Sequence, residues 1–248
     1  MFTDTHCHIL KEYYVDIPSV IASSKAKGIT KIISNGSNYE SNKETLELAN
    51  LYEDIYAAIG FHPEDIGSFE DSMLNQIVDN INKIVAIGEI GLDYHYEPCD
   101  RESQKSLFEK QLALAEKYGK PVIVHSRDAT EDTINILKKY PTVKGSLHCF
   151  SGSVETAKIY IKMGYKLGLG GVLTFKNAKI KEILKNIPPE NILLETDSPY
   201  LAPEPVRGTK NEPANIAYIA KFVAKEYGIT LKELSEITEK NVHDVFDI

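Results

Sequence analysis

The stretch Pro121-Val-Ile-Val-His125 combines a continuous apolar run with a polar, chemically versatile residue at its end. The run Ile192-Leu-Leu194 has the same character and is followed by Glu195 and Asp197. Apolar runs without alternation are typical of parallel strands that are buried on both faces. These stretches therefore predict a parallel sheet whose strands end in polar side chains.

Eight such segments occur along the chain, and amphipathic helical stretches alternate with them. Helices are predicted over Ser19–Lys27, from Asp100 to Tyr118 and over Ser153–Met163, and Thr230-Leu-Lys-Glu233 reads as a capping box. The predicted strands are Phe2–His6, Lys31–Ser34, Ile55–Gly60, Ile84–Gly88, Pro121–His125, Lys144–His148, Tyr165–Gly168 and Asn191–Thr196.

This alternation predicts a single α/β domain, residues 1–248, folded as a (β/α)8 TIM barrel. A doubly wound open sheet is the alternative. The barrel is favoured because the strand count is eight and because the polar residues follow the strands, where barrel active sites lie.

Composition narrows the classes of function. The chain has 248 residues, 42% hydrophobic and 26% charged, which is ordinary for a globular protein. Its net charge of −8 disfavours broad, non-specific adhesion to DNA, although bound cations can still receive a single phosphate. No apolar run is long enough to cross a membrane, three cysteines indicate no disulfide framework, and no leader is recognisable. We expect a cytoplasmic protein with no membrane partner.

His6 and His8 lie two residues apart at the end of the first predicted strand. Side chains at i and i+2 of a strand point to the same face, so both imidazoles can reach one point, while Cys7 faces away. Alone, this pair fits a metal site and two histidines bonded to backbone equally well. Cys7 and Cys149, each beside such a histidine, are interpreted as core residues.

The other strand ends favour the metal interpretation. Five of the seven histidines lie at or just past a strand end, and only His95 and His243 do not. Imidazole and carboxylate ligands together suit Zn²⁺, Mn²⁺ or Mg²⁺. A single polar strand end could simply bond loop backbone, but that explanation is poor for six converging residues. The convergent residues at these ends are His6, His8, Glu89, His125, His148 and Asp197.

Four histidines and two carboxylates are enough for two ions if one carboxylate bridges them. Two ions roughly 3.5–4 Å apart can hold a hydroxide and clamp a phosphoryl oxygen, which suits hydrolysis of a phosphate ester.

Taken in order, the motifs of the chain resemble those of the TatD-like metal-dependent deoxyribonucleases, which belong to the amidohydrolase-type barrel superfamily. The resemblance extends from residue 2 to about residue 245. The motifs are Asp-Thr-His-Cys-His8, Gly-Phe-His-Pro63, Gly-Glu-Ile-Gly-Leu-Asp-Tyr94, His-Ser-Arg-Asp128, His-Cys-Phe-Ser-Gly152, Glu-Thr-Asp-Ser-Pro-Tyr-Leu201 and Arg-Gly-Thr-Lys-Asn-Glu-Pro213.

The resemblance implies a metal-dependent hydrolase that cleaves phosphodiester bonds of DNA. It implies a 3′-to-5′ exodeoxyribonuclease that prefers single strands or 3′ ends, with a hydroxide activated by two metal ions as the nucleophile. The ions would be Mg²⁺, Mn²⁺ or Zn²⁺. In this pattern His6, His8 and Asp197 bind one ion and His125 and His148 the other. Glu89 bridges them, and Asp197 also orients the attacking water or takes its proton.

Five further residues are candidates for substrate contact, each with an ordinary alternative. His62 is either a phosphate contact or a loop histidine bonded to backbone. Arg127 is either a phosphate contact or the partner of Asp128 or another acid. Tyr94, like Tyr200, either stacks on a base or packs. Glu195 shares strand parity with Asp197, so it is expected to face the site, where it either binds a third ion or supports the other ligands. The five candidates are His62, Tyr94, Arg127, Glu195 and Arg207.

Two other functions stay open. One is a related amidohydrolase-type enzyme acting on a carbonyl ester or amide, such as an aminoacyl ester or a lactone, or on a small phosphoester. The other is a barrel that has lost catalysis and only binds. A monomer is plausible. The final segment, Asn241-Val-His-Asp-Val-Phe246, departs from the family pattern at a helix expected to pack on the barrel floor.

Overall fold

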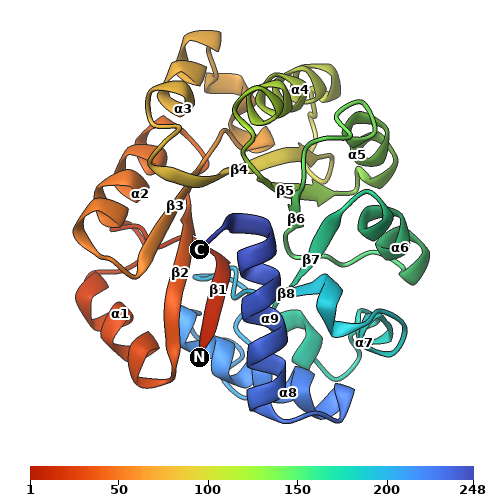
Figure 1. The fold of residues 1–248 in the computed structure, drawn as a ribbon. Coiled ribbons are helices and arrows are strands. Elements are labelled where there is room, and N and C mark those ends of the chain that lie inside the picture. The colour runs from red at the N-terminus through yellow and green to blue at the C-terminus, as the bar shows by residue number, and fades with distance from the viewer.

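The structure is a computed structural model that describes all 248 residues. Its eight parallel strands follow one another in chain order around a barrel, and helices surround them (Figure 1). The strands are β1 Phe2–Cys7, β2 Ile29–Asn35, β3 Ile55–Ile59, β4 Ile84–Asp93, β5 Val122–Arg127, β6 Gly145–Leu147, β7 Tyr165–Leu169 and β8 Ile192–Leu194.

The first and last strands lie against each other. Thr5 Oγ1 donates to the carbonyl of Leu194 at 3.0 Å, and the Asp197 N–H donates to the carbonyl of His6 at 2.9 Å. The predicted (β/α)8 barrel is therefore confirmed, and the doubly wound alternative is wrong because an open sheet would leave its edge strands apart.

The helices begin and end where capping chemistry indicates. Asp100 accepts the Ser103 N–H at the start of α4, Gly119 ends that helix at φ +64°, and the Thr230–Glu233 capping box is formed. The α-helices are α1 Ile17–Ala26, α2 Tyr39–Leu51, α3 Asn75–Asp79, α4 Arg101–Tyr118, α5 Thr130–Leu137, α6 Val154–Lys162, α7 Lys181–Asn186, α8 Ile216–Tyr227 and α9 Leu231–Phe246. Short 3₁₀ turns are η1 Pro63–Ser68, η2 Asp71–Leu74, η3 Gly171–Thr174, η4 Pro189–Asn191 and η5 Pro213–Asn215.

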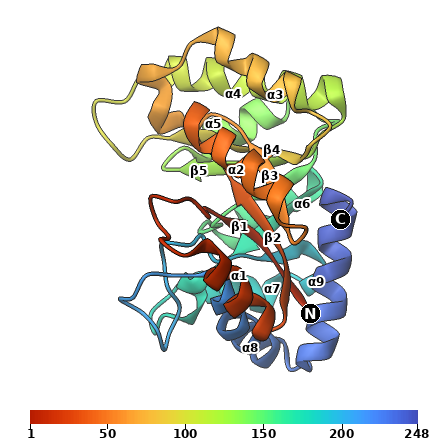
Figure 2. The same ribbon diagram turned by 90° about the vertical axis from the view of Figure 1, so that its left-hand side faces the viewer.

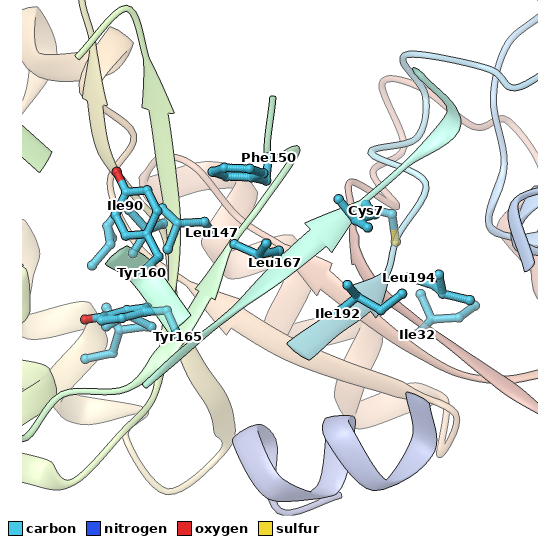
Figure 3. Close-up of a cluster of buried hydrophobic side chains, with 14 of the residues drawn as sticks. Cys7, Ile32, Ile90, Leu147, Phe150, Tyr160, Tyr165, Leu167, Ile192 and Leu194 are labelled. Atoms are coloured by element: carbon cyan, nitrogen blue, oxygen red, sulfur yellow. The ribbon is translucent and has the colours of Figure 1, made fainter. Parts of the chain in front are cut away.

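The larger hydrophobic core lies between the strands and the surrounding helices. Figure 3 shows part of it, with Tyr160 and Tyr165 beside aliphatic side chains of β6 and β7. Cys7 lies in the same core near Ile32 and Leu194, and its thiol donates to a backbone carbonyl. The expectation that Cys7 faces away from the histidines is confirmed.

A second, smaller core fills the floor of the barrel. The inward side chains of five strands meet Val242 and Phe246 of α9, which crosses the end of the barrel in Figure 1. Asn241 fastens the helix there by donating to the carbonyls of Pro189 and Ile192. The last helix therefore closes the end of the barrel from which the strands start.

The opposite end is built from the loops that follow the strands. In Figure 2 these loops project on the side away from α9. The site residues must lie at this end, because it is the end toward which every parallel strand runs.

All eight strands differ from the sequence prediction at one end or at both, and the differences at β4 and β8 change the elements that carry site residues. Strand β4 continues to Asp93, so Glu89 lies inside a strand, whereas the prediction ended it at Gly88. Strand β8 ends at Leu194, so Glu195 and Asp197 come from the following loop. Asp197 has φ +54°, and strand parity therefore does not determine where these two carboxylates point.

No helix in the structure combines the length and the apolar character that a membrane span requires.

Candidate metal centre

The six residues predicted to bind metal come together at the mouth of the barrel. A cavity of about 440 Å³ opens there, and His62 lines it as well. His6 lies beneath the cavity and is fully buried. Five of the six predicted ligands line the cavity, namely His8, Glu89, His125, His148 and Asp197.

One group of donor atoms gathers around Oε2 of Glu89. This oxygen lies 3.3 Å from Nε2 of His6 and 3.5 Å from Nε2 of His8. Oδ1 of Asp197 faces the same two ring nitrogens at 3.6 Å and 3.7 Å. Two imidazoles and two carboxylates thus enclose a single point.

A second group gathers around the other oxygen of the same carboxylate. Oε1 of Glu89 lies 2.9 Å from Nδ1 of His125 and 2.8 Å from Nε2 of His148. These two ring nitrogens are only 3.0 Å apart. Each oxygen of Glu89 therefore faces a different set of donor atoms.

The outer nitrogen of two of these imidazoles has a hydrogen-bond acceptor. Nδ1 of His8 donates to the carbonyl of Asn35 at 3.0 Å, and Nε2 of His125 donates to Asp93 at 2.9 Å. A proton on the outer nitrogen leaves the lone pair of the inner nitrogen directed at the centre. These are the tautomers that a metal ion requires of its histidine ligands.

His62 has the opposite arrangement. Its Nδ1 accepts the Glu64 N–H at 3.2 Å, so we assign the ring proton to Nε2, which faces Oε1 of Glu89 at 3.4 Å. Although His62, Glu89 and His125 are close enough together to hold an ion, a protonated Nε2 cannot ligate one. His62 is therefore placed as a hydrogen-bond donor that points into the cavity.

The imidazoles govern the charge state of Glu89. Burial by itself raises the pKa of this carboxyl, but His148, His62 and His6 together hold its pKa well below the ordinary value. Conversely, the pKa of His148 is raised to about 10, against the effect of burial, by Glu89, Asp197 and Glu195. Burial and the neighbouring His148 lower the pKa of His6 well below its ordinary value. The centre thus combines an ionised Glu89 carboxylate with a neutral His6 imidazole.

Burial has the opposite net effect on three other carboxyls near the centre, whose pKa values it raises. Burial raises the pKa of Glu195 to about 8 and that of Asp4 to about 7, and it raises the pKa of Asp197 as well. Glu195 accepts the Cys149 N–H, and Gly168 makes room for it, since a Cβ there would lie 2.0 Å from the carboxylate. Glu195 therefore supports the site from below and has no access to the cavity.

The donor set fits divalent cations. Both ring nitrogens of His6 are buried without a hydrogen-bond partner, as are Nδ1 of His148 and Oε2 of Glu195. Buried polar atoms without partners are costly, and an ion bound between them would remove that cost at His6. Mixed nitrogen and oxygen donors suit Zn²⁺, Mn²⁺ or Mg²⁺.

The remaining predicted substrate contacts are scattered. Arg127 lines the cavity, and its guanidinium lies 3.9 Å from Asp93; Asp128 pairs instead with His95. Tyr94 is buried outside the cavity, where its hydroxyl donates to Asp132. Arg207 also lies outside the cavity, over the ring of Phe175 and 4.0 Å from Glu204. The structure therefore brings His62 and Arg127 to the cavity and leaves the two others away from it.

Sequence reasoning missed Asp93, which orients His125. Asp93 lies four residues after Glu89 in the same strand, and that even spacing could have identified it.

A second missed feature is a set of buried carboxamides on the helices. Gln104 both donates to and accepts from the backbone of Asp93, and Gln111 does the same at Phe61. The sequence feature that could have identified them is the presence of two glutamines, seven residues apart, on the apolar face of α4.

Asn42 and Asn211 act in the same way at other strand ends. Asn42 pairs with both backbone groups of Gly60, two residues before His62. Asn211 donates to the carbonyls of Thr196 and Tyr200, on either side of Asp197. Buried amides thereby hold the backbone beside His62, Asp93 and Asp197.

The chain is similar to known proteins along its whole length. The family model described as TatD related DNase matches residues 3–247. The chain is 41% identical over 254 residues to an uncharacterised metal-dependent hydrolase of Bacillus subtilis, YabD, with all of both chains covered. It is 32% identical to YcfH of Escherichia coli K12, also named a metal-dependent hydrolase, over 99% of this chain and 95% of that one. The crystal structure of YjjV, a TatD homolog from Escherichia coli, superposes with a TM-score of 0.94 at 30% identity, covering 100% of this chain and 98% of that one.

Proposed function

The chain belongs to the family of TatD-related DNases and is a metal-dependent hydrolase, and from that premise we propose that it cleaves phosphodiester bonds of DNA. The substrate is a single strand or an unpaired 3′ end, from which nucleotides are removed in the 3′-to-5′ direction. The observation that carries the proposal is the division of the Glu89 carboxylate, whose two oxygens face two separate sets of ring nitrogens.

The residues divide into two ligand sets in this proposal. His6, His8 and Asp197 would hold one divalent cation, and His125 and His148 the other, with one oxygen of Glu89 for each. Divalent cations held there supply positive charge for a phosphoryl oxygen and lower the pKa of water, and this lets an acidic protein accept a polyanion at one point. Mg²⁺, Mn²⁺ and Zn²⁺ all suit these donors.

The protein's own groups position the reactants. Asp197 orients the attacking water and accepts its proton, since its carboxylate lines the cavity and its pKa is raised by burial. The Nε2–H of His62 donates a hydrogen bond to a phosphoryl oxygen. The new bond joins the water oxygen to phosphorus, and the bond from phosphorus to the 3′ oxygen of the preceding nucleotide breaks. The products are a nucleoside monophosphate and a strand shortened by one nucleotide.

The test is cleavage of a 5′-labelled single-stranded oligonucleotide by purified protein with Mg²⁺ or Mn²⁺. Addition of EDTA and the variant Asp197→Asn serve as controls. We expect a ladder that shortens from the 3′ end and that is lost in both controls. An intact oligonucleotide, together with turnover of an aminoacyl ester or a lactone by the metal-loaded protein, would assign the site to carbonyl chemistry instead.

A further inference from the structure

Two tyrosines beside the metal centre are unusually exposed. Only three of the fourteen tyrosines in the chain are exposed, and two of them, Tyr96 and Tyr200, line the same cavity as Glu89. Their exposed fractions are 59% and 50%. The third, Tyr39, lies outside this cavity. Neither ring at the centre is used by the chemistry proposed above.

The two rings lie on opposite sides of the barrel mouth. Tyr96 follows β4 and Tyr200 follows β8, four strands further around an eight-stranded barrel. Figure 2 shows the two loops at the upper and lower ends of the same side of the molecule, one in yellow after β4 and one in blue after β8. Both rings line the cavity that Glu89 also lines, and they reach it from these two loops.

Each ring is held by neighbours that leave much of it free. The Arg127 guanidinium lies 5.0 Å from the centroid of the Tyr96 ring and is itself 3.9 Å from Asp93. The hydroxyl of Tyr200 donates to that of Tyr13 at 3.0 Å, and these two rings meet edge to face at 5.9 Å. A ring that is already held loses little conformational entropy when a flat ligand stacks on it.

We propose that Tyr96 and Tyr200 are stacking platforms for the two nucleobases that flank the scissile phosphate. This inference rests on the proposed DNA substrate and specifies how the strand is held. Every base offers a flat π-face to an aromatic ring, so stacking binds a strand without reading its sequence. Arg127, which already lies over Tyr96, adds positive charge where the backbone enters.

The arrangement selects against paired ends. Neighbouring bases in a duplex stack on each other, whereas platforms on opposite sides of the centre require them to separate. Only an unpaired end can separate its last two bases without also breaking base pairs. The platforms would therefore make the preference for single strands a property of two side chains.

The experiment combines protein variants with modified substrates. Wild-type protein, Tyr96→Leu and Tyr200→Leu are assayed on a single-stranded octanucleotide and on two versions of it that carry an abasic site at the 3′-terminal or the penultimate position. Tyr39→Leu is the matched control, since it removes an exposed tyrosine outside the cavity. Thermal unfolding of each variant checks that the fold is retained.

On the intact strand we expect each platform variant to raise KM roughly tenfold, the loss that removing one stacked base produces. Each variant should show no rise in KM on the abasic substrate that lacks the base stacked on that tyrosine. The position at which this occurs should differ between Tyr96→Leu and Tyr200→Leu. Tyr39→Leu should leave KM unchanged. An equal penalty on intact and abasic strands, or pairing of both tyrosines with one position, overturns the inference.

A binding measurement separates this inference from the proposed reaction. Strands with 2-aminopurine at either position are titrated into metal-loaded Asp197→Asn protein, in which no turnover is expected, and quenching of the fluorescence reports stacking. Quenching that depends on Tyr96 and Tyr200 supports the platforms even if wild-type protein fails to cleave, which would overturn the reaction alone. Normal cleavage without such quenching overturns the platforms alone, and the absence of both overturns both.

Discussion

Nε2 of His125 lies 2.9 Å from Oδ2 of Asp93, while Nδ1 of the same ring lies 2.9 Å from Oε1 of Glu89. The ring is thus held between an orienting carboxylate and the proposed bridge. Asp93 is itself 3% exposed, and Gln104 fixes its backbone from α4. Asp93 thereby connects β4, helix α4 and the His125 ring on β5.

The first prediction concerns that contact. Asp93→Asn removes the charge that keeps the outer proton on His125, so metal affinity should fall about 10–100-fold, the usual cost of losing such a partner. Isothermal titration with Mn²⁺ or Zn²⁺ measures it. Asp128→Asn is the control, because Asp128 pairs with His95 at the surface. Equal affinity in the two variants would show that Asp93 does not orient the ligand.

The second prediction concerns the bridge. Glu89→Ala removes an oxygen from both ligand sets, so both binding events should weaken, whereas His125→Ala should mainly weaken one. Calorimetric stoichiometry separates these cases. Metal should also raise Tm in wild-type protein, because it binds only the folded state, and this rise should disappear in Glu89→Ala. Equal losses in the two variants would argue against a bridging carboxylate.

The third prediction separates a donor from a ligand. Since Nδ1 of His62 accepts a backbone N–H, His62→Ala should leave metal affinity within a factor of about three while kcat falls roughly 100-fold. His62→Gln, which can still donate a hydrogen bond, should recover part of the loss. Titration and steady-state kinetics on the same preparations provide both numbers. A loss of metal affinity as large as that of His125→Ala would instead make His62 a ligand.

The fourth prediction concerns the buried carboxamides. Gln104→Leu leaves the N–H of Asp93 without a partner and its carbonyl with only the weak thiol donor of Cys99, so the free energy of unfolding should fall by about 2–4 kcal/mol. Urea denaturation measures it. Ala113→Leu places the same side chain on the exposed face of α4 and should change stability by less than about 0.5 kcal/mol. If both variants were equally stable, the paired hydrogen bonds would have no net effect on folding.

Much of the fold could be predicted from local sequence. Several features act over only a few residues, so they can be identified without knowledge of the rest of the chain. They are the eight apolar runs, the capping residues such as Asp100, and Gly119 at the end of a helix. The pairing of His6 and His8 followed from strand geometry alone. Once the strands are known to be parallel, their polar ends must meet at one end of the barrel.

The site itself was only partly predictable. The sequence suggested Tyr94 as a stacking residue, but the loop after β4 turns that ring to Asp132 and brings Tyr96 to the cavity instead. Strand parity could not orient Glu195, because β8 ends at Leu194, directly before it, and the chain leaves extended geometry by Asp197. Loop paths depend on what packs beneath them, and that information lies far away in the chain.

The sequence by itself determined the barrel, the kinds of donor atom and the end of the barrel at which they gather. These properties follow from side-chain periodicity and from the common direction of parallel strands. Only the tertiary structure decided which oxygen of Glu89 faces which imidazole, which nitrogen of His62 holds the proton, and that Asp93 lies behind His125. Such relationships depend on direct atomic contacts, most of them between residues that are tens of positions apart, and they arise only when the whole barrel has closed.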